Sequence, residues 1–352
     1  MRRLITMGAV LGLVLAGCGT DTTDTASEAD GELETTSLRL GFGVDPVFAP
    51  HIAAIELGYF EEAGFTDIET TSFTSGQIAG EAVAAGEIEL WTPGNVPPIS
   101  MIHNGVPIVV LGTNTTAYLE QLVVRSDAIP QEPEDLLDLT IGLLEGSTAS
   151  AVLTNIAEAY DLDPLEFTTV NLPPPEQMTS ISTGEIDAFL VWNPWPYLAV
   201  EDPDLDVEIL HTGTVSNFPW DQGSELRTSS TRSLWVTSED FIANSPNAAA
   251  AMTEALLRGQ EYVANPANRD EVIAMVSEFL EQPVEQNEAL WDGYEFTTAF
   301  DQAYVDDMQA YTEFLAETGR IADAMDPMSY TYTGFVERYD AALVDVEGDW
   351  SP

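Results

Sequence analysis

Two stretches of the chain share one pattern: residues 86–93 read GEIELWTP and residues 184–194 read GEIDAFLVWNP. Each follows a short helix-like segment, residues 77–85 and 176–183. A glycine that ends a helix, an apolar run and a Trp-x-Pro stop predict a helix followed by a buried strand. A repeated unit of this kind predicts two α/β lobes; the alternative is a chance similarity of two turns. Because ligands bind beyond the carboxyl ends of strands in open α/β sheets, the two Trp-x-Pro segments are expected on facing walls of one cleft.

The predicted elements alternate between strand and helix twice along the chain. The alternation runs over residues 37–111 and restarts over residues 140–210, which predicts a mostly parallel sheet in each lobe. We expect lobe I to comprise residues 36–122 plus 236–352 and lobe II to comprise residues 123–235. From residue 245 onward the chain is nearly all helical in pattern, with one helix expected over residues 284–296.

The first 18 residues have the features of a targeting segment. Arg2 and Arg3 precede an apolar run, residues 4–16, which is too short for a stable membrane span. The ending LAGC resembles the bacterial lipoprotein signal, which implies a lipid on Cys18; the alternative is an uncleaved anchor with an incidental cysteine. Cys18 is the only cysteine, so the chain can form no intramolecular disulfide and no cysteine-based metal site. Residues 19–35 are mostly small, polar and acidic, which predicts a flexible acidic tether.

The charge of the chain excludes one class of partner. The sequence contains no lysine, its ten strongly basic residues are all arginine, and its formal net charge is −50. Nothing would neutralise phosphates, so nucleic-acid binding is not expected. Acidic residues occur along the whole length, which favours a solvated, halophilic surface suited to concentrated salt.

Two helix starts are candidate anion sites. Residues 74–76 (TSG) and 146–148 (GST) each place hydroxyls and backbone N–H groups at the beginning of a predicted helix. Such a start binds an anion without a basic side chain, and the alternative is ordinary helix capping.

Aromatic residues gather after the second repeated strand. Such side chains could line a pocket for the apolar part of a small ligand or for a quaternary ammonium group; the alternative is packing between the lobes. The residues concerned are Trp192, Trp195, Tyr197, Phe218 and Trp220.

Signals for catalysis are weak. His51, His103 and His211 are isolated and have no metal-ligand spacing. The sequence has neither a Gly-x-Ser-x-Gly elbow nor a phosphate-binding Gly-Lys loop. We therefore expect no enzyme activity, no metal site and no cofactor.

The ordered set of motifs resembles the substrate-binding proteins of nitrate/sulfonate/taurine-type ABC importers, and the taurine-binding branch most. The resemblance covers about residues 37–340 and implies the type II periplasmic-binding-protein fold. This α/β fold has two lobes, each a mostly parallel sheet flanked by helices, hinged by two crossing strands, with a helical C-terminal part. The motifs are residues 73–76 (FTSG), 86–88 (GEI), 171–174 (NLPP), 184–187 (GEID), 191–194 (VWNP) and 314–321 (FLAETGRI).

The resemblance also implies a set of ligand-binding residues. They are Gly43, Val44, Asp45, Thr74, Ser75, Gly76, Gly94, Asn95, Glu120, Ser147, Thr148, Trp192 and Asn193. Taurine binders carry an acidic residue shortly before the returning strand, where this chain has Ser233, and this departure argues against taurine itself. Arg232 and Ser233 complete the expected site, and Arg232 could face an anion or pair with a surface acid.

The function implied is a lipid-anchored, extracytoplasmic receptor that delivers a small organosulfonate or related anion to a membrane permease and its ATPase, acting as a monomer. Three alternatives remain open at this point. The ligand could be nitrate, a betaine-type ammonium, a pyrimidine or an aromatic acid. The chain could be a pyrimidine-precursor enzyme of the same fold, although that chemistry resembles a case that needs cysteines this chain lacks. It could also be a sensor.

Overall fold

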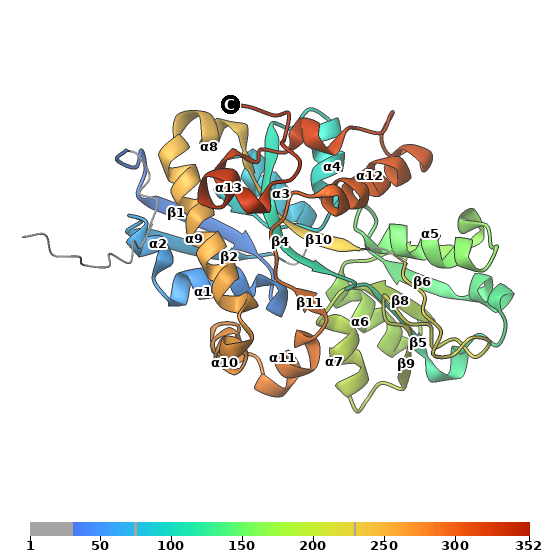
Figure 1. Cartoon of the computed structure of the whole chain (residues 1–352). Coiled ribbons are helices and arrows are strands. Elements are labelled where there is room, and N and C mark those ends of the chain that lie inside the picture. Colours follow the sequence, from blue (N-terminus) through green and yellow to red (C-terminus); the bar gives the residue numbers. More distant parts are fainter. Residues whose placement is uncertain (1–30, 74–75, 229) are drawn as a thin grey trace, which may run out of the picture.

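The computed structural model of the chain describes residues 31–73, 76–228 and 230–352. The expected lipid-bearing Cys18 and the turn residues Thr74 and Ser75 lie outside this description. The strands form one sheet of six strands and one of five, and helices flank both sheets (Figure 1). The two-lobed α/β arrangement expected from the repeated pattern is therefore present.

The sheet of lobe I has the strand order β11-β4-β10-β3-β1-β2. β1 pairs in parallel with β2 and β3, whereas β10 pairs antiparallel with β3 and β4, and β11 antiparallel with β4. The strands are β1 (Ser37–Phe42), β2 (Asp67–Ser72), β3 (Leu90–Trp91), β4 (Ile108–Ala117), β10 (Thr231–Ser238) and β11 (Tyr294–Glu295).

The sheet of lobe II has the order β7-β6-β8-β5-β9. β6 pairs in parallel with β7 and β8, and β5 pairs antiparallel with β8 and β9. The strands are β5 (Gln121–Arg125), β6 (Thr140–Leu143), β7 (Thr168–Asn171), β8 (Ala188–Val191) and β9 (Val207–His211).

The two sheets contain the same unit. β2-β1-β3 and β7-β6-β8 have the same order and direction, and the repeated sequence pattern supplies β3 and β8 in the equivalent places. Gly86 and Gly184, which precede these strands, both adopt left-handed backbone angles, with φ of 70° and 74°. Only glycine adopts such angles without strain, which is why it ends the helix in each copy.

The sheets differ from expectation in being mixed rather than mostly parallel. The cause is the pair of strands next to the lobe crossings: β5 lies antiparallel to β8 in lobe II, and β10 lies antiparallel to β3 in lobe I. All of β10 pairs with strands of lobe I, so residues 231–235 belong to that sheet and not to lobe II as expected. The return crossing therefore precedes Thr231.

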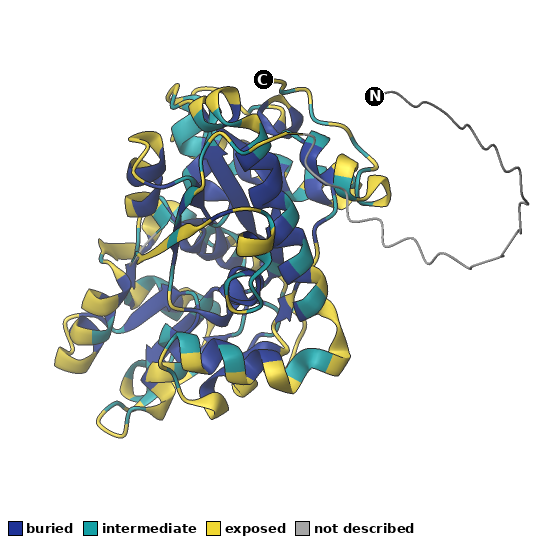
Figure 2. Ribbon diagram, turned by 90° about the vertical axis from the view of Figure 1, so that its left-hand side faces the viewer, coloured by how far each residue is buried: buried dark blue, intermediate teal, exposed yellow. Residues whose placement is uncertain are grey.

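Helices cover both sheets, and buried residues concentrate in the inner strands and on the helix faces packed against them (Figure 2). Lobe I holds α1 (Ala49–Glu56), α2 (Tyr59–Glu62), α3 (Gly76–Ala84), α4 (Val96–His103), α8 (Glu239–Asn244), α9 (Pro246–Ala264), α10 (Arg269–Phe279), α11 (Val284–Trp291), α12 (Gln302–Glu317) and α13 (Gly334–Tyr339). Lobe II holds α5 (Ala149–Ala159), α6 (Pro174–Thr183) and α7 (Trp195–Glu201). Short 3-10 helices occupy Pro46–Phe48, Ser126–Ala128, Pro133–Asp138, Pro164–Glu166, Pro266–Asn268, Pro327–Tyr330 and Ala341–Leu343.

One expected helix is shorter than its sequence pattern. The helix expected over residues 284–296 ends at Trp291, and Tyr294 then pairs with Ala117 at the edge of β4. Gly293 interrupts the helix here, because glycine is a poor helix former. The pairing buries Tyr294 and brings its hydroxyl to the interlobe region described below. Within the part of the chain that the structure describes, none of the helices combines the length and apolarity needed to cross a membrane.

Candidate functional site

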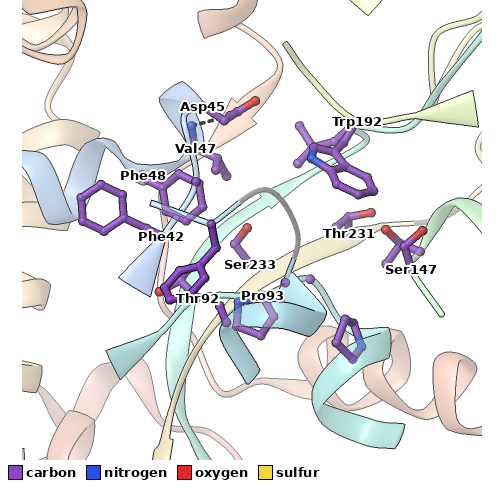
Figure 3. Close-up of a pocket in the computed structure, with 18 of the residues that line it drawn as sticks. Phe42, Asp45, Val47, Phe48, Thr92, Pro93, Ser147, Trp192, Thr231 and Ser233 are labelled. Atoms are coloured by element: carbon purple, nitrogen blue, oxygen red, sulfur yellow. Dashed lines mark hydrogen bonds between the residues drawn. The ribbon is translucent and has the colours of Figure 1, made fainter. Parts of the chain in front are cut away.

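A cavity of about 280 Å³ lies between the lobes (Figure 3). Lobe I contributes the loop after β1, the start of α3 and the residues after β3, while lobe II contributes the residues before α5 and before α7. The two repeated Trp-x-Pro segments both line it, with Thr92 and Pro93 from lobe I and Trp192 and Pro194 from lobe II. The repeated sequence pattern therefore predicted the position of this cavity.

Most of the expected ligand-binding residues that the structure describes line this cavity. They are Gly43, Val44, Asp45, Gly76, Gly94, Glu120, Ser147, Thr148, Trp192, Asn193 and Ser233. Thr74 and Ser75 lie outside the described residues. Asn95 and Arg232 are described but do not line the cavity.

Arg232 does not face an anion site. Its Nε donates a 2.7 Å hydrogen bond to Asp307 on α12, and its guanidinium lies over the ring of Tyr304. The reason is the alternation of a β-strand: Thr231 and Ser233 on either side of it line the cavity, so the side chain between them points to the opposite face. Asn95 is fully buried, and its Oδ1 accepts the Arg232 backbone N–H at 2.7 Å.

Asp45 is the first of two carboxyl groups in the cavity wall. It caps the short helix Pro46–Phe48, and its Oδ1 accepts the Val47 N–H at 2.7 Å, drawn in Figure 3, and the Tyr294 hydroxyl at 2.9 Å. Its Oδ2 is buried and has no hydrogen-bond partner among the described residues. Burial raises the pKa of Asp45 to about 7, opposed by the two hydrogen bonds.

Glu120 is the second carboxyl group, and both its oxygens have partners. It stands directly before β5 and is 2 % exposed. Its Oε1 accepts the hydroxyl of Thr148 at the start of α5, and its Oε2 accepts the hydroxyl of Thr231 on β10 at 2.7 Å. Burial raises the pKa of Glu120, and these two hydrogen bonds oppose the rise. Glu120 thus links a helix of lobe II to a strand of lobe I.

The helix start at residues 146–148 offers fewer hydroxyl donors than its sequence suggested. The Ser147 hydroxyl donates to the Leu144 carbonyl at 2.7 Å, and the Thr148 hydroxyl donates to Glu120. Neither side chain caps the helix in the usual way. The backbone N–H groups of Ser147, Ser150 and Ala151 also donate to backbone carbonyls, so an anion at this start would use the remaining N–H groups of the first turn and the positive end of the helix dipole.

The apolar wall of the cavity includes residues that the sequence did not distinguish from core. Phe73 and Trp91, which belong to the sequence motifs, line it from lobe I, and Trp192 and Trp195 line it from lobe II. Phe42 and Phe48 of lobe I line it too, and the sequence did not single them out. Such residues in a strand or helix normally indicate packing, so no sequence signal separated them from the core.

The other members of the predicted aromatic cluster pack within the protein. The rings of Phe218 and Trp220 stack in lobe II with centroids 4.8 Å apart, and Tyr160 contacts both edge-on. Tyr197 packs against the core of lobe I. None of these lines the cavity.

The three histidines lie outside the cavity lining, although one of them supports it. His51 is fully buried, its Nε2 lies 2.9 Å from Oγ1 of the lining residue Thr92, and burial lowers its pKa to about 3. His211 is also buried, with a pKa lowered to about 4, and His103 accepts a hydrogen bond from the Ala322 N–H. Across the described ranges, no cluster of three or more His, Cys, Asp or Glu side chains could hold a metal ion.

Comparison with known proteins gives a consistent assignment. Residues 31–277 match the model of the NMT1-like family. The taurine-binding periplasmic protein of Escherichia coli is 26 % identical over 302 residues, covering 81 % of this chain and 88 % of that protein. The nitrate/nitrite binding protein NrtA of Nostoc is 25 % identical over 70 % of this chain, which spans only 58 % of that longer relative.

Solved structures share the fold. The alkanesulfonate-binding protein SsuA of Xanthomonas axonopodis, bound to MOPS, superposes with a TM-score of 0.70 at 17 % identity, covering 85 % of this chain and 99 % of that one. The nitrate-binding protein NrtA of Synechocystis also gives 0.70, at 18 % identity, covering 89 % and 90 %. At these identities the likeness establishes the two-lobed fold of periplasmic binding proteins.

Proposed function

Because the chain belongs to the NMT1-like family, we propose that it is the extracytoplasmic solute-binding protein of an ABC importer. The observation that carries the proposal is the interlobe cavity, whose wall comes from both lobes. A ligand held there contacts both lobes at once, so it stabilises the closed arrangement that a permease recognises. The two relatives described above are named as binding proteins, and the taurine-binding one as periplasmic.

The ligand is a small organic solute with an anionic group, of the organosulfonate or taurine-like class. Two features of the cavity support this choice. The backbone N–H groups at the starts of α3 and α5 suit an anionic head, and the aromatic wall around Trp192 suits a short apolar body. The named ligands of the relatives are taurine, aliphatic sulfonates and nitrate; all carry an anionic group, and the first two also have an organic body.

The protein works with partners at the membrane. The proposal includes a lipid on Cys18, which tethers the receptor through residues 19–35, and a permease with an ATPase that takes up the ligand. ATP-binding proteins of bicarbonate and nitrate transport are among the relatives, which supports an ATP-driven system.

A thermal-shift screen tests the assignment. The purified protein is heated with sulfonates, nitrate, betaines, pyrimidines and aromatic acids, and hits are measured by calorimetry. A ligand at a hundred times its Kd should add about 2.7 kcal/mol to the free energy of unfolding. A hit whose affinity falls in Trp192→Ala supports the cavity as the binding site. A complete absence of binding in this panel would contradict the proposed function.

A further inference from the structure

The ionisable residues of the cavity wall are all acidic. Asp45 and Glu120 line the cavity, whereas no arginine or histidine of the described segments does so. The arginine nearest in sequence to the wall, Arg232, is paired with Asp307 on the other side of β10. A ligand that carries only negative charge would therefore meet two carboxyl groups and no basic side chain to balance them.

The two carboxyl groups differ in how many of their oxygens have a hydrogen-bond partner in the protein. Both oxygens of Glu120 accept hydrogen bonds from threonine hydroxyls, so its acceptor sites are already used by the protein. Asp45 has partners on Oδ1 only, and its buried Oδ2 has none among the described residues. A buried carboxylate oxygen without a donor costs free energy, and such groups in native proteins call for a partner. In a cavity wall the natural partner is a donor on the ligand.

We propose that Asp45 binds a protonated nitrogen of the ligand and selects solutes that carry such a group over plain anions. This inference rests on the proposed function and names the part of the ligand that the sequence left open. Ser233 contributes only a neutral hydroxyl to the same wall, whereas Asp45 contributes a carboxyl group from the loop after β1. Trp192, an aromatic side chain of the same wall, favours a cationic group nearby.

The positions in the cavity fit a ligand with two different ends. In the view of Figure 3 the side chain of Trp192 lies between Asp45 and Ser147. Asp45 comes from lobe I, whereas Ser147 stands at the start of α5 in lobe II. A solute with an ammonium group at Asp45, an anionic group at the α5 start and its carbon chain against Trp192 would use all three features.

Matched ligand pairs test the inference by calorimetry on the purified protein. The pairs are taurine with isethionate, and 3-aminopropanesulfonate with propane-1-sulfonate. The amine-bearing member of at least one pair should bind about ten- to a hundredfold more tightly than its partner, because a hydrogen bond to a charged group is one of the strong ones. Asp45→Asn should abolish that preference, so that the two members of the pair bind with similar affinity.

Asp307→Asn is the matched control. It makes the same change of charge, but Asp307 pairs with Arg232 outside the cavity, so the preference should persist. The comparison within the wild-type protein needs no variant and stands even if Asp45→Asn fails to fold. Equal affinities within every pair, or equal weakening of both members in Asp45→Asn, would overturn the role of Asp45 while leaving the proposed function intact. Failure of every compound to bind would overturn both.

Discussion

The hydroxyl of Tyr294 donates a 2.9 Å hydrogen bond to Oδ1 of Asp45, although 249 positions separate the two residues in the chain. Tyr294 lies on β11 at the edge of the lobe I sheet. Burial and the nearby Asp45 carboxyl raise the pKa of Tyr294 well above 10, so the hydroxyl keeps its proton and remains a donor. Tyr294 thus orients Asp45 and leaves Oδ2 available to a ligand.

The pKa of Asp45 predicts a pH dependence of stability. Its pKa in the folded protein, about 7, lies above the usual value of 3.8. Between these values the folded state binds more protons than the unfolded state, so the contribution of Asp45 to the free energy of unfolding is greatest below pH 4 and falls as the pH rises towards 7. Its titratable hydrogen-bond partner, Tyr294, stays protonated over this range.

Thermal unfolding of wild type and Asp45→Asn from pH 4 to 8 measures this contribution. Asparagine does not titrate, so the melting temperature of the variant should increase relative to that of the wild type as the pH rises. Subtracting the two melting temperatures removes the contribution of the other carboxyl groups, which both proteins share. A difference that is constant over this range would show that Asp45 does not titrate there.

Trp192 is expected to contribute much of the apolar binding energy. Burial of a short carbon chain against the indole is worth on the order of 1–3 kcal/mol. Trp192→Ala should therefore weaken binding about ten- to a hundredfold in calorimetry with a ligand from the screen. Trp350→Ala is the control, because Trp350 packs against Tyr332 and donates to Glu239 away from the cavity. Unchanged affinity in Trp192→Ala would place the site elsewhere.

The threonines that bond to Glu120 are expected to stabilise the fold. Thr231→Val keeps the shape of the side chain but removes the donor to Oε2. An unpaired oxygen of a buried carboxyl costs about 1–3 kcal/mol, so the free energy of unfolding in urea should fall by that amount. Thr148→Val removes the donor to Oε1 and should behave alike. In a Glu120→Gln background the loss should be smaller, and a loss of the same size there would argue that the threonines act independently of Glu120.

The acidic surface predicts stabilisation by salt. With a formal net charge of −50, repulsion among carboxylates opposes folding at low ionic strength, and screening relieves it. The melting temperature should rise markedly between dilute buffer and molar sodium chloride. A flat response would mean that local ion pairs, such as Arg258 with Glu62, already compensate the charge.

Cys18 is predicted to carry the membrane anchor. Cys18→Ala should abolish incorporation of labelled lipid and should release the protein or leave it unprocessed, as seen by fractionation and mass spectrometry. The wild-type protein labelled in parallel is the control. Membrane-bound, lipid-labelled protein in the variant would exclude Cys18 as the attachment site.

The repeated pattern predicted the fold because it consists of local signals, the end of a helix and the buried strand that follows. Gly86 and Gly184 each end a helix before a buried strand, and these signals depend only on near neighbours in the chain. Two copies of one local unit were enough to predict two lobes and the cleft between them. The antiparallel placement of β5 and β10 depends on which strands meet across the sheet, which no local pattern encodes.

The composition of the site was predictable only in part. Glycines, hydroxyls and Trp192 at strand and helix ends carried a recognisable signal. For Arg232 the sequence left open an anion or pairing with an acid, and the structure shows pairing with Asp307. The sequence could not decide between the two because the orientation of Arg232 follows from the register of β10, where its neighbours Thr231 and Ser233 line the cavity. Tyr294 gave no signal, because a two-residue strand has no periodicity and its contact with Asp45 spans most of the chain.

The hydrogen bond between Glu120 and Thr231 has a consequence for how the molecule can be rebuilt. It joins the point where the chain enters lobe II to the point where it leaves, so both ends of that segment are fixed at one place. Lobe II is thus an insertion in lobe I, and its two boundaries in the chain lie next to each other. Replacing lobe II with the corresponding lobe of a relative, joined at these two boundaries, would exchange the part of the cavity wall that holds Trp192 and the start of α5. Asp45 would be kept. Each half of the recognition surface could then be varied on its own.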